Sequence, residues 1–253
     1  MRLYAVKTRV IEACDNLVDV ILESLRDQSL KIEDGDILAL ASKVVAYAEN
    51  RILKLENVKA SEEARKLADR FSLTPEFAEL ILREADRIYG GVENAVLTLK
   101  NDVLTANAGI DRKNTPEGFV ALWPKHVKEA AKCLKEEIMR KTGKNVAVLI
   151  VDSRLTPLRM GTTGLALAVA GFKPVKDCRG EGDIFGKPLI ITRHAIADDL
   201  ASAAHLLMGE TAEKTPVVLI RDAPVDFEDR VYGSEDMMIQ FDRCIFMGTF
   251  NIQ

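Results

Sequence analysis

Residues 146–152 read VAVLIVD, six consecutive apolar residues closed by an aspartate. A short apolar run rich in β-branched residues is typical of a buried strand, and it is far too short to span a membrane as a helix. A buried strand requires a substantial core, and 253 residues can supply one as a single large domain or two small ones. The run also delivers an acid at its carboxyl end, a common way to place a ligand on a rigid support.

Other segments predict a mixture of strands and helices. Residues 3–11, 37–41, 188–195 and 216–221 are interpreted as strands, with a hairpin around Lys100-Asn101. Helices are predicted after a cap at Asp15 and over residues 61–71, 74–89, 127–142 and 197–210, with Gly90-Gly91 ending the second of these ranges. Without a regular βαβ rhythm, this mixture favours an α+β fold. The chain is treated as one unit over residues 1–253, and a division into two subdomains stays open.

Charge and cysteine usage narrow the classes of partner and compartment. The formal net charge of -4 argues against a general nucleic-acid or anionic-membrane binder. The first fifteen residues interrupt their apolar positions with charges and do not resemble a signal peptide. The four cysteines form no metal-binding spacing, so we expect reduced thiols, most of them buried, in a cytoplasmic protein.

Three acids follow the ends of predicted elements: Asp111 in NAGID, Asp152 in VDS and Glu210 in MGE. Carboxylate oxygens from separate segments suit hard divalent cations such as magnesium and manganese, which also take waters and substrate phosphates. Each acid can equally cap a turn or pair with a basic residue, and no spacing proves that the three converge.

Several polar positions could meet a phosphate. Ser42-Lys43 lies where a predicted strand passes into a helix, and residues 152–164 combine hydroxyls, glycines and two arginines. Asn107 and Asn114 can contact a ligand or hold their own loop, and Gly109 suits close approach to a ligand or a turn. The Walker A, GxGxxG, HExxH and GxSxG patterns are absent. Structural roles are expected for the isolated histidines 126, 194 and 205.

Taken together, these segments resemble the coenzyme F420-0:L-glutamate ligase family. SKVVAYAEN, NAGIDRKN, VDSR, LALAVAGF, GDIFGKPL, ADDLASAA, LLMGE and PVVLIR occur in that order over nearly the whole chain. The resemblance implies an α+β ligase fold that forms an intertwined homodimer. It further implies an amide ligase that uses GTP and Mg²⁺ or Mn²⁺, with K⁺ as a further candidate ion, to add L-glutamate to F420-0 through an acyl phosphate.

The resemblance also implies roles for particular positions. Metal ligands would be Asp111, Asp152, Ser153 and Glu210, and catalytic residues Asp111, Asp152 and Arg159. Nucleotide contacts would come from Thr8, Arg9, Val10, Ile11, Ser42, Lys43, Tyr47 and Asn114. The chain departs from the family pattern at Tyr47, where a lysine is expected, at residues 154–156 and at Phe185. These departures leave two alternatives open, a ligase joining a different acid and amino acid, and a nucleotide- or metal-binding homologue without catalysis.

Overall fold

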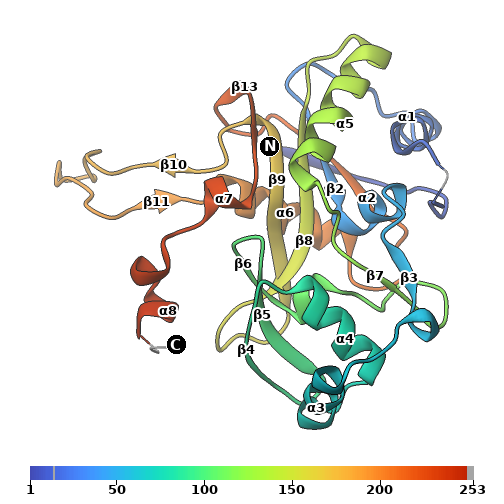
Figure 1. Ribbon diagram of the computed structural model, residues 1–253. Coiled ribbons are helices and arrows are strands. Elements are labelled where there is room, and N and C mark those ends of the chain that lie inside the picture. The colour runs from blue at the N-terminus through green and yellow to red at the C-terminus, as the bar shows by residue number, and fades with distance from the viewer. Residues whose placement is uncertain (14, 250–253) are drawn as a thin grey trace.

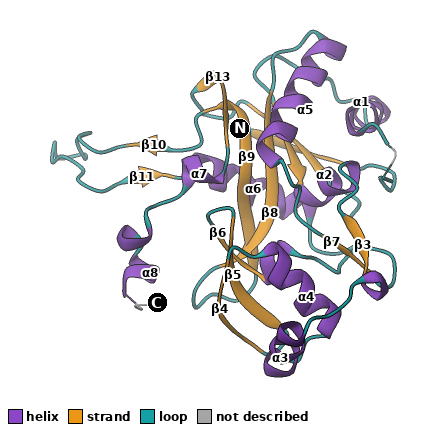
Figure 2. Ribbon diagram, in the orientation of Figure 1, coloured by secondary structure: helices purple, strands orange, loops and turns teal. Residues whose placement is uncertain are grey.

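A six-stranded sheet forms the centre of the molecule (Figures 1 and 2). The computed structural model describes residues 1–13 and 15–249. The strand order is β1-β12-β2-β8-β9-β13, in which β2 and β8 run parallel and every other neighbouring pair is antiparallel. The bounds are β1 (Arg2–Val6), β12 (Val217–Arg221), β2 (Ile37–Ala41), β8 (Ala147–Leu155), β9 (Thr162–Phe172) and β13 (Phe227–Tyr232).

Helices cover both faces of this sheet because its central strands are apolar on both sides. Leu38 and Leu40 point into a core shared with α1 (Leu17–Asp27) and α5 (Val127–Thr142), whereas Ile37 and Ala39 point into a core shared with α6 (Ile196–Met208). Successive side chains of a strand face opposite sides, so a strand buried on both faces must be apolar throughout. The short helix α2 (Ser42–Ala48) follows β2 directly.

A smaller unit packs below the sheet in Figure 1 around its own apolar cluster, which includes Phe71, Phe77, Ile81 and Val96. It consists of α3 (Glu62–Phe71), α4 (Pro75–Glu84) and the antiparallel strands β4 (Arg87–Val92), β5 (Ala95–Lys100) and β6 (Val103–Ala106). The pair β3 (Ile52–Lys54) and β7 (Phe119–Ala121), with the turns η1 (Leu55–Asn57) and η2 (Asn107–Gly109), links this unit to the rest of the chain.

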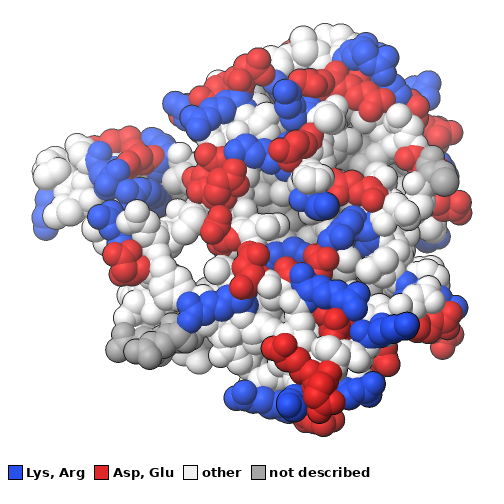
Figure 3. All heavy atoms as spheres, in the orientation of Figure 1, with Lys and Arg blue, Asp and Glu red and all other residues white. Residues whose placement is uncertain are grey.

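An arm extends from the sheet at the left of Figure 1 and carries β10 (Lys176–Asp177) and β11 (Arg193–His194). The chain then ends in α7 (Ser234–Met237), η3 (Phe241–Arg243) and α8 (Ile245–Thr249). Acidic and basic side chains are interspersed over the face drawn in Figure 3. Among the residues that the structure describes, no helix is long and apolar enough to cross a membrane.

The α+β prediction is confirmed, while four local predictions need correction. The helix predicted over 74–89 ends at Glu84, because Ile88 pairs with Thr98 in a sheet and Gly90-Gly91 belong to β4. Sheet pairing here overrides the helical spacing of the apolar residues. The strand predicted over 188–195 is reduced to Arg193–His194, since this segment lies in the arm and has no buried sheet face to join.

The other two corrections concern the amino-terminal segment. The strand predicted over 3–11 ends at Val6. Asn16, not Asp15, caps α1, because its side-chain oxygen accepts the Asp19 N–H at 2.9 Å while Asp15 pairs with Arg9 at 2.6 Å.

The cysteines are also less buried than expected. Cys133 is exposed and Cys178 and Cys244 are half-buried, and all three are free thiols. Cys14 lies outside the described residues. The expectation of mostly buried cysteines is therefore wrong for the three that the structure describes, because each lies on a surface element or outside the cores.

Candidate functional site

One edge of the central sheet gathers the ends of β1, β2 and β12. Ala41 and Val151 are partners in the parallel pair β2–β8, so Ser42, where α2 begins, lies beside Asp152, which is still within β8. Strand β12 runs antiparallel to β1 and β2, which brings the residues after β1 and those before β12 to the same edge. The carboxyl end of β2, the strand parallel to β8, lies at this edge. Ligands bind at the carboxyl ends of parallel strands in many α/β sheets.

A cavity of about 360 Å³ opens at this edge. Its lining includes twelve of the residues predicted for the site: Thr8, Arg9, Val10, Ile11, Ser42, Lys43, Tyr47, Asp111, Asn114, Asp152, Ser153 and Glu210. These positions come from five separate segments of the chain, and the fold brings them into one wall. Their convergence was not deducible from sequence spacing.

Asp111 enters the cavity from the NAGID loop (residues 107–111) of the smaller unit. Its backbone pairs with Ala121 in both directions, at 2.9 and 2.8 Å. Its carboxylate forms an ion pair with Lys43 Nζ at 2.7 Å and accepts the Lys113 backbone N–H at 2.8 Å.

Asp152 is a carboxyl of the cavity whose pKa is raised. Burial raises its pKa to about 6, against the lowering effect of the Ser153 backbone N–H and the Trp123 indole N–H, and the charge of Asp111 raises it further. A half-buried carboxyl that accepts two N–H donors and the Ser42 hydroxyl, with no ammonium or guanidinium partner among the described residues, is suited to bind a cation.

Glu210 follows α6 and completes the acidic set. Burial opposes its ionisation, but hydrogen bonds from Lys113, Thr162 and His205 outweigh that effect and hold its pKa at about 2. His205 lies one helical turn earlier on α6, and its Nε2 is 2.9 Å from Glu210 Oε1. Glu210 is therefore ionised at neutral pH, and the ammonium of Lys113 balances its charge.

Lys113 lies among the three acids. Its ammonium contacts Glu210, and the charges of Glu210, Asp111 and Asp152 all raise its pKa. The three acids line one cavity, and two of them pair with lysines, Asp111 with Lys43 and Glu210 with Lys113. Their oxygens, with the Ser153 hydroxyl, are of the type that magnesium and manganese prefer. As the side chains stand in residues 1–13 and 15–249, no three histidine, cysteine or acidic groups are close enough to hold a metal ion.

The wall predicted to contact a nucleotide includes Asn114 and Tyr47. Asn114 lines the cavity and donates its amide to the Thr211 carbonyl at 2.8 Å, while Tyr47 faces the same space and has its pKa raised by burial. Asn107, by contrast, accepts the Val96 N–H at 2.8 Å and holds its own loop. Gly109 meets the ring of Trp123 rather than the cavity.

Arg159 is the predicted site residue that does not line the cavity. It lies in the exposed hairpin turn between β8 and β9, so its catalytic role stays a prediction. Sequence reasoning in turn overlooked Lys113 and Trp123 and assigned His205 a structural role. Lys113 lies inside the quoted NAGIDRKN segment, and His205 precedes Glu210 by five residues, so local signals were available for both.

Comparison with known proteins shows the family of the chain. The family model described as F420-0:Gamma-glutamyl ligase matches residues 5–222. A coenzyme F420:L-glutamate ligase of Methanothermobacter thermautotrophicus is 36% identical over 216 residues, covering 85% of this chain and 86% of the relative. The enzyme of the same name from Methanocaldococcus jannaschii is 40% identical over 197 residues, covering 78% of this chain and 79% of the relative. The enzyme from Methanosarcina mazei is 37% identical over 215 residues, covering 85% of this chain and 83% of the relative. The chain belongs to the F420-0:gamma-glutamyl ligase family and is an enzyme of the ligase class.

Proposed function

We propose that the protein joins L-glutamate to the carboxylate of F420-0 in a reaction driven by GTP and a divalent cation, through an acyl phosphate. The observation that carries the proposal is the cavity at the edge of the sheet, where three acids, two lysines and the predicted nucleotide wall share one space. The similar enzymes are coenzyme F420:L-glutamate ligases, which supports L-glutamate and an F420 compound as substrates.

The reaction has two steps. A carboxylate oxygen of the acid attacks the γ-phosphorus of GTP, and GDP leaves as the acyl phosphate forms. The amine of glutamate then attacks the acyl carbon, phosphate leaves, and the nitrogen loses a proton as the amide forms. A bound divalent cation supplies charge neutralisation on the phosphates during transfer.

The residues of this chain bind and orient the reactants. Asp111, Asp152, Ser153 and Glu210 would hold the cation, whereas residues 8–11 and Asn114 would contact the nucleotide. Lys43 and Lys113 now neutralise two of these acids, at the mouth of the same cavity. Once a cation takes over that neutralisation, both ammonium groups become available to phosphate oxygens. K⁺ is a further candidate ion for the same set of oxygens.

A second candidate is a ligase of the same type that joins a different acid or amino acid. Tyr47 favours it, because this side chain lines the cavity where a lysine was expected and supplies no fixed positive charge. Nucleotide choice or substrate choice would change as a result. Screening the protein with other acids and amines distinguishes the two candidates.

Release of GDP by the purified protein tests the proposal. GDP should form only when an F420-0-like acid, L-glutamate, GTP and Mg²⁺ or Mn²⁺ are all present. Asp111→Ala and Asp152→Ala should each abolish this turnover while the far-ultraviolet circular dichroism is unchanged. Full turnover by either variant would refute the metal assignment. Calorimetric binding of GDP without turnover by any acid would favour a homologue that has lost catalysis.

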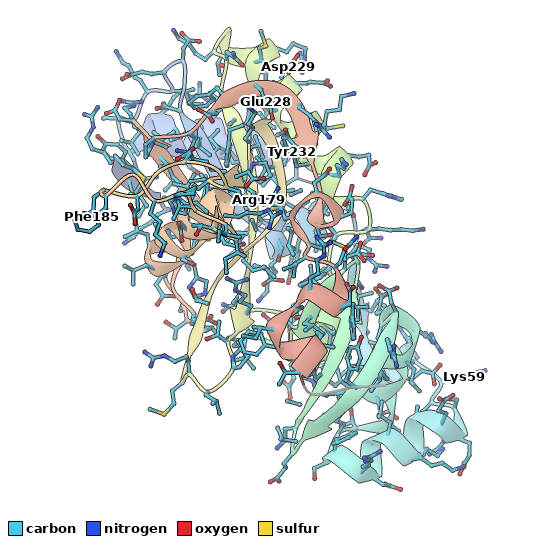
Figure 4. The ribbon with its side chains drawn as sticks, turned by 90° about the vertical axis from the view of Figure 1, so that its left-hand side faces the viewer. Lys59, Arg179, Phe185, Glu228, Asp229 and Tyr232 are labelled. Atoms are coloured by element: carbon cyan, nitrogen blue, oxygen red, sulfur yellow. The ribbon has the colours of Figure 1, made fainter. Side chains whose placement is uncertain are left out.

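We also propose that the protein forms a homodimer. The arm carries large apolar side chains that are 78–93% exposed, namely Ile184, Phe185, Ile190 and Ile191. Figure 4 shows Phe185 at the outer end of this arm, directed away from the sheet. Contiguous exposed apolar surface marks an interaction site, and a second copy would cover it. Light scattering should give twice the mass of 28.0 kDa, and a monomer at micromolar concentration would contradict the proposal.

A further inference from the structure

Trp123, the single tryptophan of the chain, lies against the candidate metal site without lining its cavity. Its side chain is 3% exposed, and its indole N–H donates to Oδ2 of Asp152. The other carboxylate oxygen of Asp152 accepts the Ser153 backbone N–H at 2.7 Å. The Ser42 hydroxyl also hydrogen-bonds this carboxylate. A carboxylate has about four lone-pair positions, so one remains for a cation.

The segment that carries Trp123 also holds Asp111. Ala121 exchanges two backbone hydrogen bonds with Asp111, and Trp123 follows two residues later. One short stretch of chain therefore contacts an acid of the NAGID loop through its backbone and an acid of β8 through its indole. The distance between the two carboxylates depends on this stretch.

Packing and hydrogen bonds hold the tryptophan in place. Gly109 leaves room for the ring, since a Cβ at that position would lie 2.2 Å from it. The Trp123 carbonyl accepts a hydrogen bond from Arg51 Nε at 3.1 Å, and the same guanidinium pairs with Glu84 at 2.8 Å. Glu84 in turn contacts the buried Lys100. The contact with Gly109 and the anchored backbone carbonyl hold the indole so that its N–H points to Asp152.

We propose that Trp123 is a positioning residue that sets the orientation of Asp152 relative to Asp111 for divalent-cation binding. This inference rests on the proposed function, because it takes the two aspartates to be cation ligands. Hydrogen-bond partners of metal ligands fix the orientation of those ligands, and their loss weakens metal affinity by about 10- to 100-fold.

Trp123→Phe removes the donor and keeps an aromatic ring, so calorimetric Mg²⁺ titration of this variant tests the role. We expect Mg²⁺ affinity to fall by about 10- to 100-fold while circular dichroism is unchanged. Tyr232→Phe is the matched control, since it removes a buried aromatic donor to a carboxylate, that of Glu228, on the outer strand β13 (Figure 4). It should leave Mg²⁺ affinity within twofold of the wild type.

Emission from the single tryptophan gives a second measurement that does not depend on the folding of a Trp123 variant. In the metal-free protein, Asp152→Ala removes the acceptor of the indole N–H and should shift the emission maximum. Unchanged emission would show that the contact is absent and overturn the inference. Wild-type Mg²⁺ affinity in Trp123→Phe would overturn it while leaving the proposed metal site intact. Failure of the wild type itself to bind Mg²⁺, with or without GTP, would instead refute the metal part of the proposed function and the inference with it.

Discussion

Replacing Gly109 by alanine would add a methyl group where the ring of Trp123 already lies. An ideal Cβ at residue 109 falls 2.2 Å from Cε2 and 2.3 Å from Nε1 of the indole. The backbone φ of +71° is a second obstacle, because an L side chain in the left-handed region costs about 1–2 kcal/mol. Overpacking of a buried site adds about 1–3 kcal/mol. We therefore expect Gly109→Ala to lower the free energy of unfolding by about 2–5 kcal/mol.

Gly118→Ala separates the two contributions. Gly118 has a similar φ of +79°, but no heavy atom lies within 4 Å of its ideal Cβ. This variant should lose only the conformational part, about 1–2 kcal/mol. The difference between the two variants then measures the contact between residue 109 and Trp123.

Urea unfolding followed by circular dichroism measures both free energies, provided that the dependence on urea has the same slope in each variant. Tryptophan emission should report the same transition, which tests two-state behaviour in a chain of this size. Equal losses in Gly109→Ala and Gly118→Ala, within about 0.5 kcal/mol, would refute the close packing of Trp123 on the NAGID loop.

Two further predictions concern charge. Lys113→Met should tighten Mg²⁺ binding by about 30-fold, because an ammonium about 4 Å from a divalent cation opposes its binding by about 2 kcal/mol even at the dielectric constant of water. Calorimetry checks this, and Lys128→Met, which removes an ion pair at α7, is the control that should leave the affinity unchanged. Hydrogen bonds from Ser61 and Arg83 lower the pKa of Glu79 from 4.5 to about 2, so this group stabilises the fold above pH 4.5 and the contribution is lost as the pH falls towards 2. Glu79→Gln should therefore lose less unfolding free energy than the wild type between pH 4.5 and 2, and equal losses in acid titrations of the two proteins would contradict the assignment.

The strands and helices with a clear apolar period were predictable, because the spacing of neighbouring residues determines them. The apolar runs at 37–41 and 147–151 form buried strands, and the spacing and caps at 61–71 and 127–142 produce helices with nearly the predicted bounds. Residues 74–89 were only half predictable. The segment has helical spacing to its end, yet Ile88 belongs to a sheet because the next strand along the chain, β5, pairs with it.

The sequence by itself determined the α+β class and the buried strands, because apolar periodicity acts over a few positions. Tertiary structure alone decided what the residues of the site do together. Parallel pairing of β2 with β8 puts Ser42 beside Asp152, and the bridge from Asp111 to Ala121 brings the NAGID loop to the same edge. Lys113 and Trp123 became part of the site only through these long-range pairings. Register between distant segments depends on packing of the whole chain, and no local spacing encodes it.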